Sequence, residues 1–199
     1  MRGDRRENSF TFRQLTGQTF RTREGMALIE IDVDGRRRTL PIRGKSLRHW
    51  LQLMLYEETG KRPSQAELRS NIDLLEAQAL QNGPEAEVHV RAALVDDRVY
   101  IDLADDLGRA VEIGPEGWSV IEKAPVHYMR SPGMRPLPIP EKGGSIHDLR
   151  SLVNFAVNDD FALIVAWLLD ALRNAGAHPV LVINGSEGTA KSTLLEIGI

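Results

Sequence analysis

Apolar and polar side chains alternate in several short stretches of this chain, a pattern typical of antiparallel strands with one buried face. Residue groups that favour tight turns lie beside these stretches: Asp34-Gly35, Asp96-Asp97 and Gly114-Pro115-Glu116-Gly117. The predicted strands cover residues 28–33, 39–42, 88–94, 99–103, 110–113 and 118–121. Because each of these turns is short, we expect the strands that flank it to form an antiparallel hairpin.

Two stretches between the second and third predicted strands have the helical period instead. The first begins at Ser46 as its N-cap and ends at Gly60, with an inward face of Leu47, Trp50, Leu51, Met54 and Leu55. The second begins at the capping box Ser64-Gln65-Ala66-Glu67 and ends at Asn82-Gly83-Pro84, with a stripe of Leu68, Ile72, Leu75 and Ala79. We therefore predict an α+β fold in which two helices cover one face of the antiparallel hairpins.

The chain divides into four parts by composition. Residues 1–25 are polar and rich in arginine, and we interpret them as a mobile leader, with a basic arm for nucleic acid as the alternative. Residues 26–123 carry the predicted α+β domain. Residues 124–144 are rich in proline and glycine, as in a linker or a strap across a surface. Residues 145–199 are predicted to start a second domain.

The second domain is expected to begin with helices. Ser145 caps a short helix, with Asp148 three residues on, and Asn158 caps a longer helix over residues 159–174. The longer helix is apolar on nearly all sides, which is typical of a helix buried in a larger domain. Residues 180–183 are then a continuous apolar run, which is typical of a strand buried on both faces.

A candidate phosphate-binding loop follows this predicted strand. The spacing G-x-x-x-x-G-K-[ST] is matched by Gly185, Ser186, Glu187, Gly188, Thr189, Ala190, Lys191 and Ser192, with Ala190 in place of the second glycine and Thr193 continuing into a predicted helix. Strand, glycine loop and helix N-terminus form a context in which backbone N–H groups bind phosphates. The alternative interpretation is an ordinary strand-to-helix turn that contains Lys-Ser by chance.

The residue types in the motif have defined roles toward ATP and Mg²⁺, the predicted cofactors. The ammonium of Lys191 would contact the β- and γ-phosphates, and the hydroxyl of Ser192 would be a ligand of Mg²⁺. A Cβ at Ala190 costs about 1–2 kcal/mol if the loop needs a positive φ there. Otherwise this Cβ only crowds the nucleotide.

The region around the motif resembles ATP-binding proteins of phages and integrated mobile elements, which are similar in layout to primase–helicases of the D5 type. The resemblance covers residues 26 to 195 and is carried by E-I-G-P-E-G-W (112–118), P-V-H-Y-M-R (125–130), L-P-I-P (137–140), W-L-L-D-A-L (167–172) and P-V-L-V-I-N-G-S-E-G-T-A-K-S-T-L (179–194). Its specific motif is the phosphate loop alone, and members of the family often carry Ala before the Lys. It implies an α/β P-loop NTPase domain and a role in DNA replication, with DNA as a partner.

Several parts of such a domain do not follow the loop in this sequence: a second-metal carboxylate on a later strand, a water-positioning residue and an arginine finger. We therefore expect the chain to hold the truncated start of the domain, to bind nucleotide weakly and to hydrolyse little ATP by itself. The strand at residues 180–183 would lack neighbouring strands, so we expect self-association or disorder from residue 178 onward.

Composition limits the class of protein. The chain has 199 residues, 42% of them hydrophobic and 27% charged, which fits a globular protein. A formal net charge of −3 argues against a uniformly basic nucleic-acid surface. The sequence has no cysteine and no apolar N-terminal segment of the signal-peptide type, so we expect no disulfides, no membrane partner and a cytoplasmic location.

Two acidic groupings have both a metal-binding and a structural interpretation. Glu30, Asp32 and Asp34 lie on one face of a predicted strand, and we favour a solvated face with Asp32 opposite Arg37. The second grouping is Asp102, Asp105 and Asp106, for which we favour strand-end and turn chemistry closed by Gly108.

The histidines show no metal-ligand spacing. The trio Ser145, His147 and Asp148 is interpreted as the start of a helix rather than as a catalytic triad. A second class of function therefore stays open: residues 26–144 would be a non-enzymatic module that binds nucleic acid or drives oligomerisation.

Overall fold

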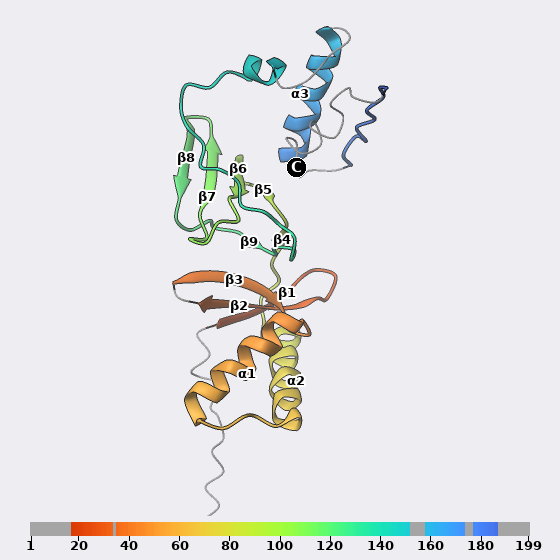
Figure 1. Ribbon diagram of the computed structural model, residues 1–199. Coiled ribbons are helices and arrows are strands. Elements are labelled where there is room, and N and C mark those ends of the chain that lie inside the picture. The colour runs from red at the N-terminus through yellow and green to blue at the C-terminus, as the bar shows by residue number, and fades with distance from the viewer. Residues whose placement is uncertain (1–16, 34, 152–157, 174–176, 187–199) are drawn as a thin grey trace, which may run out of the picture. The chain divides into compact units, whose positions relative to one another are not determined.

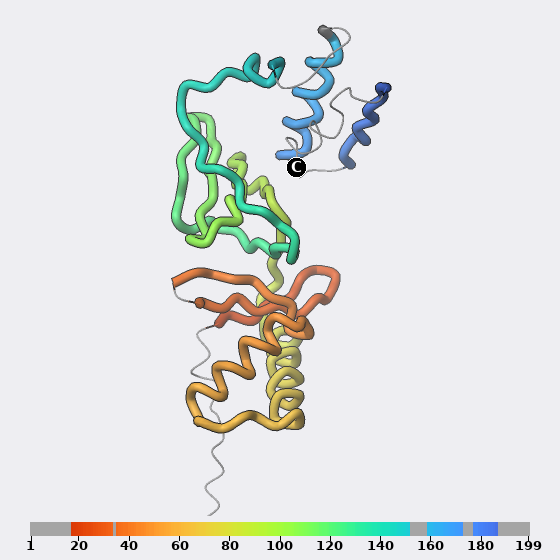
Figure 2. Tube along the Cα trace, in the orientation of Figure 1, coloured from red at the N-terminus to blue at the C-terminus, as the bar shows by residue number. Residues whose placement is uncertain are grey.

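The computed structural model describes residues 17–33, 35–151, 158–173 and 177–186. The chain forms two compact units: unit 1 lies within Met1–Val88 and includes His127–Arg130, and unit 2 lies within His89–Val126 and Ser131–Ile199. In Figure 2 unit 1 runs from red to yellow, apart from residues 127–130, and unit 2 runs from green to blue. The division falls inside residues 26–123, which we had expected to be a single domain.

Unit 1 contains a three-stranded antiparallel sheet of β1 (Gly17–Arg21), β2 (Ala27–Val33) and β3 (Arg36–Pro41), in that order. The prediction of a leader that extends to residue 25 is wrong, because Gly17–Arg21 pairs with β2 along its whole length. Phe20 is opposite Leu28 in this ladder and only 1% exposed. A single buried aromatic residue in a polar stretch gives too weak a period-two signal to reveal a strand.

The turn between β2 and β3 has the predicted position. Val33 pairs with Arg36, so β2 and β3 form an antiparallel hairpin at the predicted place, and residue 34 lies outside the described residues. Gly35 has a φ of 78°, and its N–H donates to the carboxylate of Asp32. A positive φ of this kind favours glycine because the residue has no Cβ.

Two helices pack on the same side of this sheet, as Figure 1 shows. They are α1 (Lys45–Thr59), which contacts β3, and α2 (Gln65–Asn82), which contacts β1 and β2. The core between helices and sheet consists of Ile29, Ile31, Ile42, Leu47, Leu51, Leu55, Leu68, Ile72, Leu75 and Ala79. The predicted α+β class, with antiparallel strands and two helices on one face, is confirmed for unit 1.

The helix ends agree with the predictions except at the start of α1. Gly44, and not Ser46, is the N-cap residue of α1, so this helix begins earlier than expected and without a side-chain cap. Gly60 ends it in the left-handed conformation with a φ of 67°. Ser64 and Glu67 form the predicted capping box, in which each side chain accepts a hydrogen bond from the other residue's N–H.

The C-terminus of α2 is bound tightly to β1. Arg21 donates from its guanidinium to the carbonyl of Gly83 at 2.8 Å and to that of Leu80 at 3.3 Å. A Cβ on Gly83 would lie 2.5 Å from the carbonyl oxygen of Ala79 and 3.0 Å from the Cα of Phe20. The close approach of helix and strand therefore requires glycine here, although the φ of Gly83 is an ordinary −71°.

Unit 2 contains a four-stranded antiparallel sheet in chain order. Its strands are β5 (Ala92–Val95), β6 (Arg98–Asp102), β7 (Ala110–Gly114) and β8 (Gly117–Ile121). The predicted hairpins are confirmed: Val95 pairs with Arg98, and Gly114 with Gly117. In the first turn both Asp96 and Asp97 have a positive φ, as a two-residue hairpin turn of type I′ requires.

The predicted strand at residues 88–94 is two strands. β4 (Val88–His89) pairs with β9 (His127–Tyr128), whereas β5 pairs with β6. The alternation of side chains continues through both strands, but the pairing partner changes between them. Periodicity reports which face a residue occupies and carries no information about the partner strand, so this break could not be predicted.

The second half of residues 124–144 forms the predicted strap, which is bound to other residues of unit 2 by hydrogen bonds. Leu137 donates its N–H to the carbonyl of Leu103 at 2.8 Å. Arg91 donates from one guanidinium to the carbonyls of Asp102, at 3.1 Å, and Arg135, at 2.9 Å. The first half contains β9, which the proline-rich composition had concealed.

A 3₁₀ helix (Ile146–Ser151) and α3 (Asn158–Arg173) follow the strap. Phe161 and Ile164 of α3 are buried, but Leu163 is 67% exposed and Leu169 is 60% exposed. The expectation that α3 is buried on nearly all sides is therefore wrong for the part of the chain that the structure describes. Within that part, no helix has the length and the apolar character needed to cross a membrane.

Gly83 provides the most specific test of the contact between α2 and β1. We expect Gly83→Ala to lower the free energy of unfolding by about 1–3 kcal/mol, because the added Cβ meets backbone atoms that cannot move independently. Gly133→Ala is the matched control: a Cβ there meets no atom within 4 Å, and the change should stay within about 0.5 kcal/mol. Chemical denaturation of both variants measures the difference, and equal losses would contradict this role of Gly83.

Candidate functional site

The candidate phosphate-binding loop begins at the end of the described chain. Gly185 and Ser186 are exposed, in a stretch without regular secondary structure that covers residues 177–186. The remaining predicted site residues lie outside the described residues: Glu187, Gly188, Thr189, Ala190, Lys191, Ser192 and Thr193. The structure therefore describes the entry to the loop and not the loop itself.

The strand predicted at residues 180–183 is not formed. Val180 is 86% exposed and Val182 is 71% exposed, whereas Leu181 and Ile183 are partly buried. A strand that is buried on both faces needs neighbouring strands to accept and donate its backbone hydrogen bonds. No described strand pairs with residues 180–183, so the apolar run does not adopt the conformation that its composition favours.

Side chains of α3 hold the segment that leads to the loop. The indole Nε1 of Trp167 donates to the carbonyl of Pro179 at 2.9 Å. One turn further along the helix, the carboxylate of Asp170 contacts the Nδ1 of His178 at 3.1 Å. Neither contact is evident from the apolar pattern of the helix, in which Trp167 counts only as one more apolar residue. The signal that was available is chemical: a tryptophan N–H in a partly buried position normally finds an acceptor.

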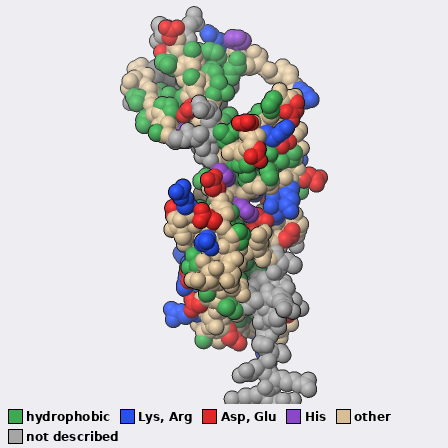
Figure 3. All heavy atoms as spheres, turned by 180° about the vertical axis from the view of Figure 1, so that it is seen from behind, with side chains coloured by type: hydrophobic (Ala, Val, Ile, Leu, Met, Phe, Trp, Pro, Cys, Tyr) green, Lys and Arg blue, Asp and Glu red, His purple; other side chains and the backbone are tan. Residues whose placement is uncertain are grey.

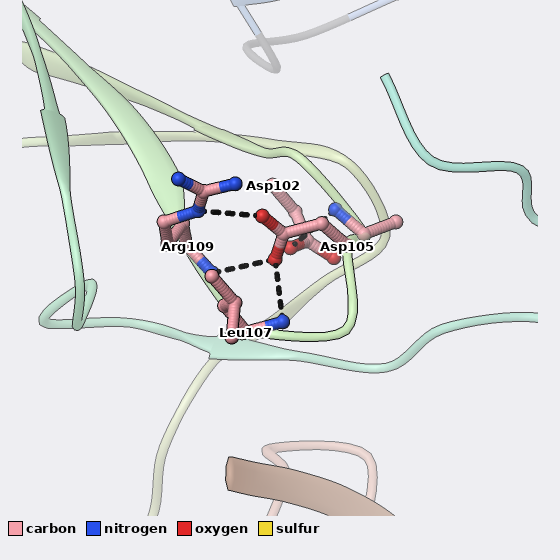
Figure 4. Close-up of polar contacts among 5 residues, drawn as sticks. Asp102, Asp105, Leu107 and Arg109 are labelled. Carbon is pink, nitrogen blue, oxygen red and sulfur yellow. Dashed lines mark hydrogen bonds and ion pairs between the residues drawn. The ribbon is translucent and has the colours of Figure 1, made fainter. Parts of the chain in front are cut away.

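The acidic grouping of Asp102, Asp105 and Asp106 is a turn, as predicted, and Figure 4 shows its hydrogen bonds. One carboxylate oxygen of Asp105 accepts from the N–H of Leu107 at 3.1 Å and from that of Arg109 at 3.0 Å. The other carboxylate oxygen contacts the Nε of Arg109 at 2.7 Å. These contacts close the loop between β6 and β7.

Asp102 is buried and also stabilises this loop. Its side chain is 1% exposed and accepts a hydrogen bond from the N–H of Ala104 at 3.0 Å, where Ala104 has a φ of 52°. The bond holds Ala104 in a conformation that non-glycine residues rarely adopt. Both carboxylates therefore form part of the loop, and among the described residues no cluster of His, Cys, Asp and Glu has a metal-binding arrangement.

The other acidic grouping differs from its prediction at Glu30. The expected solvated face holds for Asp32, which is exposed, but the side chain of Glu30 is only 15% exposed. Its two carboxylate oxygens contact different partners: the guanidinium of Arg37 at 3.2 Å and the Nδ1 of His127 at 2.8 Å. His127 comes from β9, almost a hundred residues along the chain, and a local sequence pattern contains no information about such a contact.

These partners decide the charge state of Glu30. Burial by itself raises the pKa of this carboxyl, but the hydrogen bond from His127 and the positive charge of Arg37 outweigh burial and hold the pKa below its usual value. Glu30 is therefore ionised at neutral pH. It lies on the face of β2 opposite to Ile29 and Ile31, and so on the face of the sheet that the helices leave free.

The trio Ser145, His147 and Asp148 is the start of the 3₁₀ helix, as predicted. Ser145 donates its N–H to the carboxylate of Asp148 at 3.0 Å, and its hydroxyl oxygen accepts from the N–H of His147 at 3.2 Å. The ring of His147 stacks on that of Phe161, and the guanidinium of Arg150 lies 4.2 Å from the centroid of the same ring. These contacts attach the 3₁₀ helix to α3 and do not form a catalytic triad.

On the face that Figure 3 shows, acidic and basic side chains are interspersed and form no large area of a single charge. Exposed charges of opposite sign also form ion pairs, such as those of Arg43 with Asp73 and Glu76 in unit 1. Comparison with known proteins adds no further assignment, since no protein-family model, no curated protein and no solved structure matches this chain.

The loop held by Asp105 generates a prediction about pH. Burial raises the pKa of Asp105, but its hydrogen bonds with Arg109 outweigh burial and hold the pKa below the usual value. The ionised carboxylate therefore stabilises the fold above the ordinary aspartate pKa, and this stabilisation is lost as the pH falls through the lowered value. We expect Asp105→Asn to cost about 1.5–3 kcal/mol at pH 7 and progressively less as the pH falls below the ordinary aspartate pKa, for example at pH 3.

Asp106→Asn is the matched control, because Asp106 is exposed and neighbours Asp105 in the same loop. Its effect on the free energy of unfolding at pH 7 should stay within about 0.5 kcal/mol. Urea denaturation at both pH values measures both variants. A loss for Asp105→Asn that is the same at pH 3 and pH 7 would contradict the role of the ionised carboxylate.

Proposed function

We propose that this chain binds ATP together with Mg²⁺ through residues 185–193. The observation that carries the proposal is the spacing of the glycines, the lysine and the serine of the motif: Gly185, Gly188, Lys191 and Ser192. In this order the chain offers backbone N–H groups, an ammonium and a hydroxyl, as the binding of a nucleoside triphosphate requires. The exposure of Gly185 and Ser186 supports it, because a ligand can reach the start of the loop.

The chemistry of binding follows from these residue types. Backbone N–H groups of the loop donate to the phosphates, and Lys191 neutralises part of the charge on the β- and γ-phosphates. The hydroxyl of Ser192 is a ligand of Mg²⁺, which in turn bridges phosphate oxygens. Ala190 adds a Cβ beside the phosphates, which makes this loop narrower than one with glycine at that position.

We extend the proposal to an ATPase that acts in DNA replication, of the helicase or primase–helicase type found in phages and mobile elements, in a cytoplasmic setting. The resemblance of residues 167–172 and 179–194 to that family supports this extension. In such a protein the nucleotide-binding loop drives work on DNA, so DNA is the proposed macromolecular partner. The fold of unit 1 is a packed α+β core and contributes no independent support for DNA binding.

The test is the affinity for ATP in the presence of Mg²⁺, measured by isothermal titration calorimetry. Hydrogen bonds to charged groups contribute about 1.5–3 kcal/mol each, so Lys191→Ala should weaken binding by about tenfold or more. Lys142→Ala is the control: it removes the same charge from an exposed position in the strap and should leave the affinity unchanged. Equal affinities of the Lys191→Ala variant and the wild-type protein would remove the assignment of the loop.

Self-association is a second proposal, and it concerns the apolar run near residue 180 rather than an oligomerisation module in residues 26–144. It is supported by apolar side chains that are 60–86% exposed in unit 2: Leu163, Leu169, Val180 and Val182. Exposed apolar side chains that lie close in sequence are typical of surfaces that bind another protein.

Sedimentation velocity over a range of concentrations tests this second proposal. The double variant Val180→Ser with Val182→Ser should shift the protein toward the monomer, because it removes apolar surface that association would bury. Leu53→Ser is the control, since Leu53 is 57% exposed on α1 in unit 1. A wild-type protein that stays monomeric at all concentrations would contradict self-association.

A further inference from the structure

Residues 127–130 have an unusual place in the chain. By their contacts they belong to unit 1, although the residues immediately before and after them belong to unit 2. Pro125 precedes this segment, and Pro132-Gly133 follows it. Such residues favour extended or turn conformations and interrupt regular structure. Because the chain on both sides of residues 127–130 belongs to unit 2, only non-covalent contacts hold these residues on unit 1.

The side chain of His127 makes two contacts with strands of unit 1. Its ring stacks on that of Phe20 in β1, with centroids 4.3 Å apart and an angle of 25° between the ring planes. Its Nδ1 lies 2.8 Å from the carboxylate of Glu30 in β2. The backbone of β9 also pairs with β4. One side chain therefore combines a ring contact and a charge-assisted hydrogen bond to two different strands of the sheet.

The core between the sheet and the two helices does not include this segment. The buried residues between the sheet and the helices come from residues 29–79, and none of them lies in residues 127–130. Glu30 and Phe20 are on the other face of the sheet, since Phe20 is opposite Leu28 in the ladder and side chains alternate along β2. Removal of residues 127–130 from this face would leave the packing of α1 and α2 intact.

We propose that residues 127–130 form a detachable latch, which binds the helix-free face of the β1–β3 sheet through His127 and leaves it while the core of unit 1 stays folded. Opening of the latch exposes the ring of Phe20, which is 1% exposed when the latch is closed. The open state therefore presents an aromatic surface that the closed state covers.

The charges around His127 set the direction of a pH dependence. On the face of the sheet that His127 contacts, the titratable groups are Glu30 and Asp32 on β2 and Arg37 on β3. β4 contributes His89, and Arg130 lies in the latch itself. The other arginines of β1 and β3 lie on the opposite face: Arg21, Arg36 and Arg38. Glu30 has its pKa below the usual value, so its charge stabilises the closed latch above the ordinary glutamate pKa. This contribution is lost as the pH falls through the lowered value, and acid therefore favours the open state.

Hydrogen exchange of backbone amides in the full chain tests the latch. In the His127→Ala variant we expect residues 127–130 to exchange about tenfold faster or more, while Ile29 and Ile31 in β2 keep their protection. His127→Phe retains a ring for Phe20 and loses the bond to Glu30, so its exchange should be intermediate. Glu30→Gln should also accelerate exchange, whereas Glu57→Gln, an exposed change on α1, should have no effect.

Two results would overturn the proposal. Unchanged exchange of residues 127–130 in both His127 variants would mean that His127 does not hold the segment. Parallel acceleration at Ile29 and Ile31 in the His127→Ala variant would mean that the segment is an inseparable part of the core. A His127→Ala variant that does not fold at all also gives this second result. In that case the exchange of the His127→Phe variant still tests the bond between His127 and Glu30.

Discussion

The packing of one face of β2 against α1 and α2 is the constraint on which unit 1 depends. Ile29 and Ile31 point from the central strand into a layer of helix side chains such as Leu47 and Leu68, and all four are 1% exposed or less. The helices can cover this face only because α2 ends where Gly83 allows its backbone to meet β1. Arg21 then binds the last carbonyls of α2, so the register of the sheet and the end of the helix stabilise each other.

Local features of unit 1 and unit 2 could be predicted because they are determined within a few residues. The capping box at Ser64 and the turns at Asp34-Gly35 and Asp96-Asp97 depend on short-range hydrogen bonds and backbone conformations. The stripe of α2 depends only on the helical period. Features that depend on a distant partner could not be predicted: β1, the change of partner between β4 and β5, and the contact of His127 with Glu30.

In the candidate site, too, some features depend only on the local sequence and others depend on distant residues. The spacing of its glycines, Lys191 and Ser192 is a property of the sequence alone, and the chemistry that it implies needs no distant residue. The strand expected at residues 180–183 is different, because an apolar run becomes a strand only beside other strands. The described chain instead holds this region through Trp167 and Asp170 of α3, two contacts that connect the entry of the loop to the packed part of unit 2.

Amide exchange in the presence and absence of ATP with Mg²⁺ tests nucleotide binding by residues 185–193 most directly, because it locates the bound phosphates as well as detecting them. We expect slower exchange of the amides of residues 185–193, whose N–H groups would donate to phosphate oxygens. We expect no change in β1, β2 and β3 of unit 1. Protection that appears in unit 1 alone, or no protection anywhere at millimolar nucleotide, would contradict the assignment of the loop.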